Sequence, residues 1–378
     1  MVSWSTITTI VLGLLSTVSM TSGSPIDKRA GTAYNYWETK AWGVNLGNWL
    51  VLERWMDPSI FTKYAPDAQD EWNFCKQASN PTKALQDHWN SWVTEDDFKR
   101  LQEIKANHVR IPVGYWAFIQ TDAGEPYVTT GQKQQLERIL GYCNKYGLYA
   151  IIDLHGLPGS QNGEMHSGHT TKIDFYSSYN IQRSLKTVQA VVDWMNGLDN
   201  KLKNRISAIE SANEPRVNGN DQLQILKNYY QKAYNIIARS TFKVPMMFHD
   251  GFLGLDAWKG FLQSQNAVID LHPYYAFPPN KNQDSIVKGI CNSKSSTSSF
   301  HLPVFFGEWS LASGVQGTDP WFRKMMDTQI SVYKGSGAGG TFWSLKNKIN
   351  SREWSLQQLQ NEGIVNNGTF TFHSNAQC

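Results

Sequence analysis

Two features that would direct this 378-residue chain to nucleic acid or to a membrane are missing. The formal net charge is only +3, and Lys and Arg are scattered instead of gathered into a basic stripe. No apolar run beyond the N-terminal segment is long enough to span a bilayer. We therefore expect neither a nucleic-acid partner nor membrane insertion.

Recognisable sites for nucleotides and metals are missing too. The segment GLPGSQNG, residues 156–163, contains glycines but lacks the Lys of a phosphate-binding loop. His166 and His169 in HSGH lie three residues apart, but no third ligand follows at a defined spacing. The sequence thus predicts no cofactor and no metal ion.

The N-terminus has the pattern of a secretory signal. An apolar stretch from Ile7 to about Val18 is followed by small residues, and Lys28-Arg29 resembles a dibasic processing site. Residues 1–29 are therefore expected to be a signal peptide and propeptide, and the mature, secreted chain to begin at Ala30. One glycosylation sequon, Asn367-Gly-Thr, follows near the C-terminus.

Cysteine is scarce, with four residues in all. An even number in a secreted chain is compatible with two disulfides. We expect a bond between Cys291 and Cys378, which would hold the C-terminus in place. Cys143 lies on an apolar face, so a buried free thiol and a bond to Cys75 remain alternatives.

Short apolar runs alternate with helical patterns along residues 30–378. The runs are continuous, as in parallel strands that are covered on both faces. They are 41–46, 108–113, 149–155, 206–212, 245–250, 267–274, 303–309 and 340–345. Eight such strands alternating with helices predict an α/β fold, a single (β/α)₈ TIM barrel forming one catalytic domain. The polar stretch SKSSTSS, Ser293–Ser299, is expected to be a surface loop.

Helix signals lie between these runs. Apolar residues at steps of three and four, from Leu223 to Ile237, predict an amphipathic helix. Thr94 and Asp97 resemble a capping box at the start of another.

Polar residues cluster where the expected strands end, and two carboxylates stand out among them. Glu214 follows the fourth run and Glu308 lies in the seventh, so a barrel places them across one mouth. Opposed carboxylates suit glycoside cleavage, in which one protonates the leaving oxygen and the other attacks the anomeric carbon. The 15 Trp residues agree with sugar binding, since aromatic faces stack on sugar rings, although many will be core.

Neighbouring residues support both carboxylates. Asn213 and Pro215 flank Glu214, and Pro215 restricts the backbone where the chain leaves the strand. Arg110 and Tyr274 are candidates to keep Glu308 ionised. His155 and His272 are core histidines, metal ligands or partners of sugar hydroxyls and carboxylates, and we favour the last.

Eight motifs in order give the chain a family resemblance. They are GVNLGNWLVLERWM, VRIPVGYWAF, IIDLHGLPGSQNG, SANEPR, MFHDGF, DLHPYYAF, FFGEWSLA and TFWSLK. From about Ala41 to Leu356 the chain resembles glycoside hydrolase family 5, and within it the secreted fungal β-glucanases around the exo-β-1,3-glucanases. The resemblance implies a retaining barrel enzyme without cofactor or metal, acting on β-glucan and expected to be a monomer.

The resemblance also assigns roles to residues. It makes Glu214 the acid/base and Glu308 the nucleophile. The implied substrate-binding residues are Glu53, Arg110, His155, Asn213, His272, Tyr274, Phe277 and Trp343. Asn213 would bind the sugar 2-hydroxyl, Glu53 the terminal sugar, and Trp343 would form a stacking platform.

One departure from the family pattern bears on specificity. Exo-acting members continue after GSQNG with an aromatic residue and Asp-Asn, which close the pocket, whereas this chain has Glu164, Met165 and His166. An altered end wall favours endo-β-1,6-glucan hydrolysis as the first hypothesis. Exo-β-1,3-glucanase action is the alternative, followed by a diglycoside-specific β-glucosidase and a non-catalytic glucan-binding protein.

Overall fold

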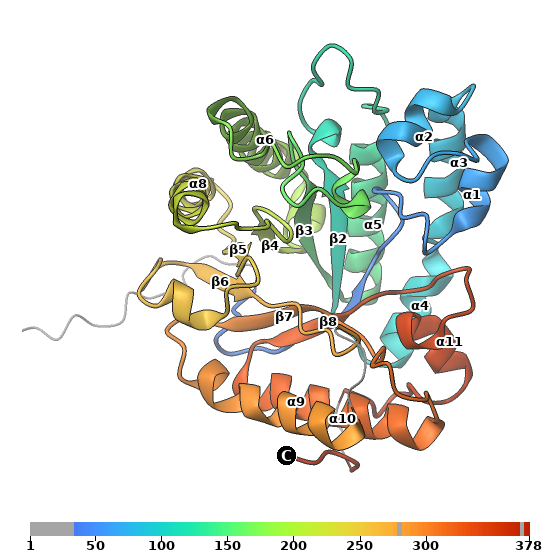
Figure 1. Ribbon diagram of the computed structural model, residues 1–378, viewed down its shortest axis with the longest axis vertical. Helices are drawn as coiled ribbons and strands as arrows, with labels where there is room; N and C mark the ends of the chain where they lie inside the picture. Colours follow the sequence, from blue (N-terminus) through green and yellow to red (C-terminus); the bar gives the residue numbers. More distant parts are fainter. Residues whose placement is uncertain (1–33, 278–281, 371–373) are drawn as a thin grey trace, which may run out of the picture.

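The chain folds into a closed barrel of eight parallel strands (Figure 1), as the sequence predicts. The computed structural model describes residues 34–277, 282–370 and 374–378, so the expected signal peptide and propeptide lie outside the described residues. The strands are β1 (Ala41–Asn45), β2 (His108–Gly114), β3 (Tyr149–Gly156), β4 (Ile206–Glu210), β5 (Met246–His249), β6 (Ala267–Asp270), β7 (Val304–Trp309) and β8 (Gly339–Phe342). Each pairs with the next, and β8 pairs with β1 through Ala41 and Gly339 to close the barrel.

Helices surround the barrel on its outside (Figure 1). They are α1 (Pro58–Tyr64), α2 (Glu71–Gln77), α3 (Pro81–Trp92), α4 (Glu95–Glu103), α5 (Gln132–Tyr146), α6 (Ser178–Gly197), α7 (Asn200–Lys203), α8 (Asn220–Ala238), α9 (Gln283–Ser298), α10 (Asp319–Ser336) and α11 (Leu356–Asn361). Between β5 and β6, a short 3₁₀ turn, η3 (Leu255–Trp258), takes the place of a helix. The capping box of Thr94 and Asp97 at α4 and the amphipathic helix α8 are both confirmed.

The N-terminal end of the barrel is filled by side chains. Tyr34 and Tyr36 pack with inward-facing residues of the strands, among them Ile151 and Phe305, in one buried cluster. The Tyr36 hydroxyl also donates to Ser207 Oγ at 3.0 Å. Because these side chains fill the N-terminal end of the barrel, a ligand can enter only at the C-terminal ends of the strands, as in other barrels of this type.

Several strands end earlier than the sequence indicates. The run 267–274 forms β6 only to Asp270, because Pro273 has no backbone N–H for a ladder bond. The run 340–345 stops at Phe342, where the Trp343–Ser344 peptide bond is cis. Residues beyond these points therefore leave the barrel wall and lie around its mouth.

The expectation of a surface loop at Ser293–Ser299 is wrong, because all but the last of these residues form the end of α9. Asn282 caps the helix, and Ile286 and Ile290 bury its inner face. Hydroxyls of the serines bond to carbonyls three or four residues earlier, for example Ser296 Oγ to Ser293 O at 3.1 Å. Composition alone suggested a loop, whereas the cap and the buried apolar face decide for a helix.

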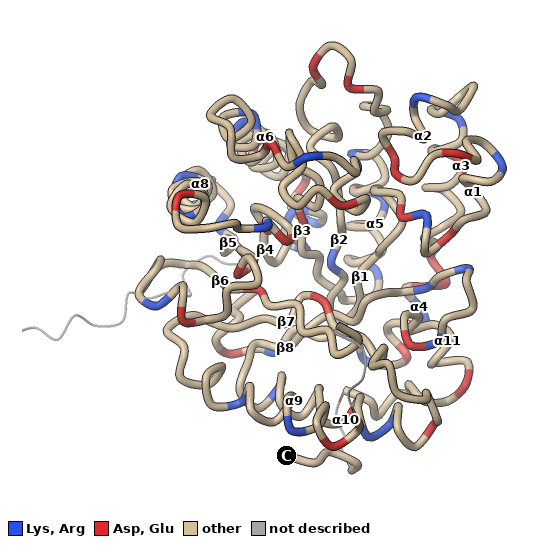
Figure 2. The backbone as a smooth tube through the Cα atoms, viewed as in Figure 1, with Lys and Arg blue, Asp and Glu red and all other residues tan. Residues whose placement is uncertain are grey.

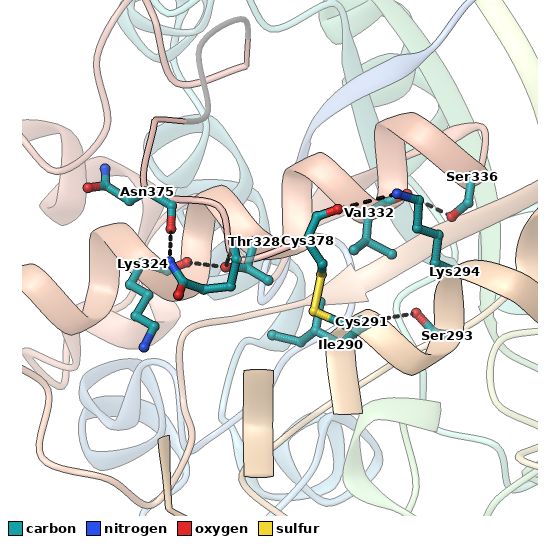
Figure 3. The surroundings of a disulfide bond; sticks show 11 residues. Ile290, Cys291, Ser293, Lys294, Lys324, Thr328, Val332, Ser336, Asn375 and Cys378 are labelled. Atoms are coloured by element: carbon teal, nitrogen blue, oxygen red, sulfur yellow. Dashed lines mark hydrogen bonds between the residues drawn. A yellow bond between two sulfur atoms is a disulfide. The ribbon is translucent and has the colours of Figure 1, made fainter. Parts of the chain in front are cut away.

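The disulfide between Cys291 and Cys378 is confirmed (Figure 3). It joins α9 to the C-terminal tail across 87 residues of sequence. The tail also bonds to α10, since Asn375 N donates to Asp327 Oδ2 at 3.0 Å. Cys75 and Cys143 are both free and buried, which decides for the free-thiol alternative.

Charges are distributed over the whole fold. Lys and Arg alternate with Asp and Glu around the helices and loops (Figure 2). Among the described residues, no helix combines the length and the apolar character that crossing a membrane requires. Asn367 of the sequon is exposed, and its glycosylation stays a prediction.

Candidate active site

A cavity of about 690 Å³ opens at the C-terminal ends of the strands, within the usual range for ligand sites. Its lining contains eight of the ten site residues expected from the sequence: Glu53, His155, Glu214, His272, Tyr274, Phe277, Glu308 and Trp343. The other two, Arg110 and Asn213, are fully buried. The topology thus brings residues from seven separate sequence motifs to one site.

Glu214 lies where the chain turns away from β4. Its backbone has a φ of +44°, a left-handed conformation that costs a non-glycine residue about 1 kcal/mol and is found at functional sites. Each carboxylate oxygen of the side chain faces one imidazole: Oε1 lies 2.6 Å from His272 Nδ1, and Oε2 lies 3.2 Å from His166 Nε2. Burial would raise the pKa of Glu214, but hydrogen bonds from His166 and His272 hold it well below its usual value.

One imidazole joins the two candidate carboxylates. His272 Nδ1 lies 2.6 Å from Glu214 Oε1 and 3.6 Å from Glu308 Oε2. Because both oxygens approach a single nitrogen, these two oxygens lie no more than about 6 Å apart. Burial opposes the charge on His272, but Glu308 and Asp270 raise its pKa well above the ordinary value.

Glu308 is held at both oxygens. Arg110 Nη1 donates to Oε1 at 2.9 Å, and the Tyr274 hydroxyl donates to Oε2 at 2.8 Å. These two donors fix the orientation of the carboxylate. The expectation that Arg110 and Tyr274 stabilise Glu308 therefore agrees with the geometry.

Arg110 organises the floor of the site. Its guanidinium is fully buried and also donates to Asn213 Oδ1 at 2.8 Å and to Glu210 Oε2 at 2.7 Å. Burial opposes its charge, but Asp153, Glu210 and Glu308 raise the pKa of Arg110 well above the ordinary value. Asn213 is thereby fixed beside Glu214.

His155, Trp343 and Glu53 also line the cavity. His155 Nδ1 bonds to Asp153 Oδ2 at 2.6 Å, and its ring stacks on Trp343 with centroids 5.6 Å apart. Glu53 Oε2 accepts from Trp55 Nε1 at 2.9 Å. Burial raises the pKa of Glu53, while nearby His155 opposes the rise.

Comparisons with known proteins agree with this geometry. The family model Cellulase (glycosyl hydrolase family 5) matches residues 75–349. The chain is 34% identical over 348 residues to probable glucan 1,3-beta-glucosidase A of Aspergillus niger, covering 88% of this chain and 82% of the relative. It is 33% identical over 380 residues to glucan 1,3-beta-glucosidase 1 of Schizosaccharomyces pombe, covering 91% and 92%. The chain belongs to glycosyl hydrolase family 5.

Solved structures show the same fold. The crystal structure of rutinosidase from Aspergillus niger matches with a TM-score of 0.81 at 24% identity, covering 88% of this chain and 99% of that chain. Membership of family 5 makes the protein an O-glycosyl hydrolase, so the non-catalytic hypothesis is set aside.

Some residues of this family 5 site were not predicted from the sequence. Asp153 and Asp270 bond to His155 and His272, each two residues further along the chain. In a strand, residues two apart point to the same face, so the spacing Asp-x-His was a usable signal. Glu210 also had a signal, since it is the only charged residue of the apolar run 206–212.

The sequence also predicted only some of the aromatic side chains around the mouth of the cavity. Trp55 and Trp354 pack edge to face with centroids 5.5 Å apart, and Trp354 also contacts Tyr274. Phe252 lines the cavity and is exposed, as is the expected Phe277. Exposed rings at a mouth provide faces on which sugars can stack.

The residues that differ from the family pattern also lie at the site. His166 lines the cavity and contacts Glu214, whereas His169 stacks on Trp72 with ring centroids 4.1 Å apart. The two histidines of HSGH therefore point to different places and do not form a pair of metal ligands. Glu164 forms an ion pair with Arg216 at 3.1 Å.

Within the part of the chain that the structure describes, two groups of side chains come close enough to hold a metal ion. They are Glu214 with His249 and His272, and Glu210 with Asp270 and His272. Both share His272, whose two nitrogens already contact Glu214 and Asp270. The donor atoms are thus engaged with one another, and the absence of a metal stays a prediction.

Proposed function

We propose that this family 5 enzyme is a retaining β-glucan hydrolase that uses Glu308 as nucleophile and Glu214 as acid/base. The contact of one imidazole with both carboxylates carries the proposal, because it limits their separation to about 6 Å. A gap of that size leaves room for direct attack on the sugar but not for a water molecule between carboxylate and sugar.

The residues around each carboxylate suit its role. Glu308 attacks the anomeric carbon as a carboxylate, and the donors from Arg110 and Tyr274 hold it in position. In the same step the proton of Glu214 passes to the glycosidic oxygen as its bond to the sugar breaks. Water then attacks the glycosyl-enzyme and returns a proton to Glu214, which frees Glu308 and completes the cycle with retention.

The proposed substrate is a β-1,3-glucan, cleaved from its non-reducing end. Support comes from the two relatives described above, which are named glucan 1,3-beta-glucosidases and match over most of their length. Buried Glu53 and the Trp343 platform lie together on one side of the cavity, where they suit a terminal sugar. This was the second hypothesis from the sequence, and the relatives favour it over endo-β-1,6 action.

Endo-β-1,6-glucan hydrolysis stays as a second candidate because of one observation. Glu164 and His166 occupy the segment where exo-acting members have an aromatic residue and Asp-Asn, and Glu164 pairs with Arg216. A polar wall at that point would let a longer chain pass. Secretion, the monomeric state and independence of cofactors stay predictions of the same proposal.

A product profile on two glucans tests the choice. Laminarin is mainly β-1,3-linked and pustulan β-1,6-linked, and early products are resolved by chain length. Glucose released from laminarin, with retained β-configuration in the first minutes of NMR, is the expected result. Oligosaccharides from pustulan would favour the second candidate, and α-glucose as first product would refute the retaining mechanism.

A further inference from the structure

The segment after β3 makes a contact with Glu214 that the family roles do not explain. His166 belongs to a single 3₁₀ turn, η2 (Met165–Ser167), and its Nε2 lies 3.2 Å from Glu214 Oε2. Its side chain is 24% exposed, so it faces the cavity while remaining largely shielded from water. An ionisable group at this distance affects the proton on Glu214.

The position of His166 is fixed by contacts on both sides of Glu214. Gln161 Nε2 donates to the carbonyl of Asn213 at 2.9 Å, and its own carbonyl accepts from Arg216 N at 3.0 Å. Glu164 pairs with the Arg216 side chain. The segment that carries His166 is thus bound to the backbone directly before the acid/base and to the backbone two residues after it.

A second neighbour limits where a proton can lie. Asn162 Oδ1 accepts from Glu164 N at 3.0 Å, which turns the Asn162 amide N–H groups toward His166 Nε2 at 2.8 Å. When Nε2 accepts from Asn162, it carries no proton, and the proton is on Glu214. When Nε2 is protonated, it donates to Glu214, which is then ionised. One proton can therefore lie either on His166 Nε2 or on the Glu214 carboxylate.

Nearby charged groups affect how the proton is distributed between His166 and Glu214. Carboxylates of Glu53, after β1, and Glu308, of β7, face His166, while His155 of β3 lies with its ring centroid 5.7 Å away. His272, after β6, contacts the other oxygen of Glu214. Burial opposes protonation of His166, but Glu214, Glu53 and Glu308 raise its pKa to about 9.

We propose that His166 competes with Glu214 for one proton and thereby sets the upper pH limit at which Glu214 acts as a proton donor. His166 is a positioning residue in this scheme, since it acts through Glu214 and forms no bond to the substrate. The proposal rests on the proposed function, because it requires Glu214 to be the acid/base.

The test replaces His166 with a neutral side chain and follows kcat/KM against pH. In His166→Gln no imidazolium lies beside Glu214, so the proton stays on Glu214 to higher pH. With laminari-oligosaccharides, we expect the alkaline limb to move up by about 1 pH unit or more. An alkaline limb at its wild-type position would overturn the proposal.

The control is the same substitution three residues away. His169 stacks on Trp72 and does not contact Glu214, so His169→Gln should leave the pH profile in place. A shift of equal size in His169→Gln would assign the effect to the segment instead of to the imidazole, and would also overturn the proposal.

A second substrate separates proton donation from general disturbance. The 2,4-dinitrophenolate of 2,4-dinitrophenyl β-glucoside departs without protonation, so His166→Gln should not move the alkaline limb on this substrate. If both substrates shift alike, His166 does not act through the proton of Glu214. Should His166→Gln fail to fold, NMR titration of His166 in wild type and in Glu214→Gln gives the answer. The titration should move to lower pH in Glu214→Gln, and an unchanged titration contradicts the proposal.

Failure of the proposed function has a different signature. If Glu214→Ala kept wild-type activity on laminari-oligosaccharides, Glu214 would not be the acid/base, whatever His166 does. If Glu214→Ala loses activity as expected and His166→Gln leaves both pH profiles unchanged, only the His166 proposal fails.

Discussion

The Tyr274 hydroxyl donates to Glu308 Oε2 at 2.8 Å, and it comes from the loop after β6 while Glu308 belongs to β7. Burial and the charge of Glu308 raise the pKa of Tyr274 well above its ordinary value, so the phenol keeps its proton and remains a donor. Glu308, the proposed nucleophile, is thus oriented by a neutral group on one oxygen and by Arg110 on the other.

Removing this donor should slow the reaction without preventing folding. In Tyr274→Phe the ring remains, but one hydrogen bond to a carboxylate is lost, worth about 1.5–3 kcal/mol. We expect kcat on laminari-oligosaccharides to fall about 10- to 100-fold, with a smaller change in KM. A KM change alone would show that Tyr274 binds substrate and does not orient Glu308.

Replacing the nucleophile should abolish turnover and leave binding intact. Glu308→Gln keeps the shape of the side chain but cannot attack the anomeric carbon. We expect kcat to fall by about 10³-fold or more. Calorimetry with laminari-oligosaccharides should still detect binding within a few-fold of wild-type affinity. Near-normal activity would refute the assignment of Glu308.

The barrel was predictable because its strands are buried on both faces. Runs such as 149–155 therefore read as continuous apolar segments, and the structure places β3 at Tyr149–Gly156. The barrel topology then brings Glu214 and Glu308 to one mouth, so the candidate site followed from strand order alone. Strand ends were less predictable, because they depend on local features such as Pro273.

Contacts made by loops could not be predicted from the sequence. The pairing of Glu164 with Arg216 and of His166 with Glu214 depends on the course of the segment after β3. Nothing in residue types or spacing specifies that course. The buried network under the site had a partial signal in the Asp-x-His spacing of β3 and at the end of β6, and in Glu210 as the only charged residue of the run 206–212.

The disulfide should contribute to stability without affecting the chemistry. It closes 87 residues of sequence and lies at α9, on the outside of the barrel (Figure 3). A loop of that length corresponds to an entropic stabilisation of about 4–5 kcal/mol at most. Cys291→Ser with Cys378→Ser should lower the Tm and leave kcat on laminarin unchanged at 25 °C. Loss of activity in a folded double variant would contradict this separation.

The raised pKa of His166 predicts a pH dependence of stability. A pKa of about 9 in the folded state, above the ordinary 6.5, means that the native protein binds this proton more tightly. The resulting stability is fully present below pH ~6.5 and is lost as the pH rises toward about 9. As the pH rises over that window, the Tm of the wild type should therefore fall relative to the Tm of His166→Gln. A difference that is constant from pH 6 to 9 would show that the proton of His166 does not stabilise the fold.

Removal of the acid/base gives the sharpest test of the mechanism. Glu214→Ala cannot protonate the leaving group, so kcat/KM on laminari-oligosaccharides should fall by about 10²- to 10⁴-fold. On 2,4-dinitrophenyl β-glucoside, formation of the glycosyl-enzyme needs no proton and should proceed, while attack by water becomes slow. Azide needs no general base, so it should restore turnover and yield β-glucosyl azide, the retained product. An α-configured azide would mean direct displacement without a covalent intermediate on Glu308, because a single attack on the anomeric carbon inverts it.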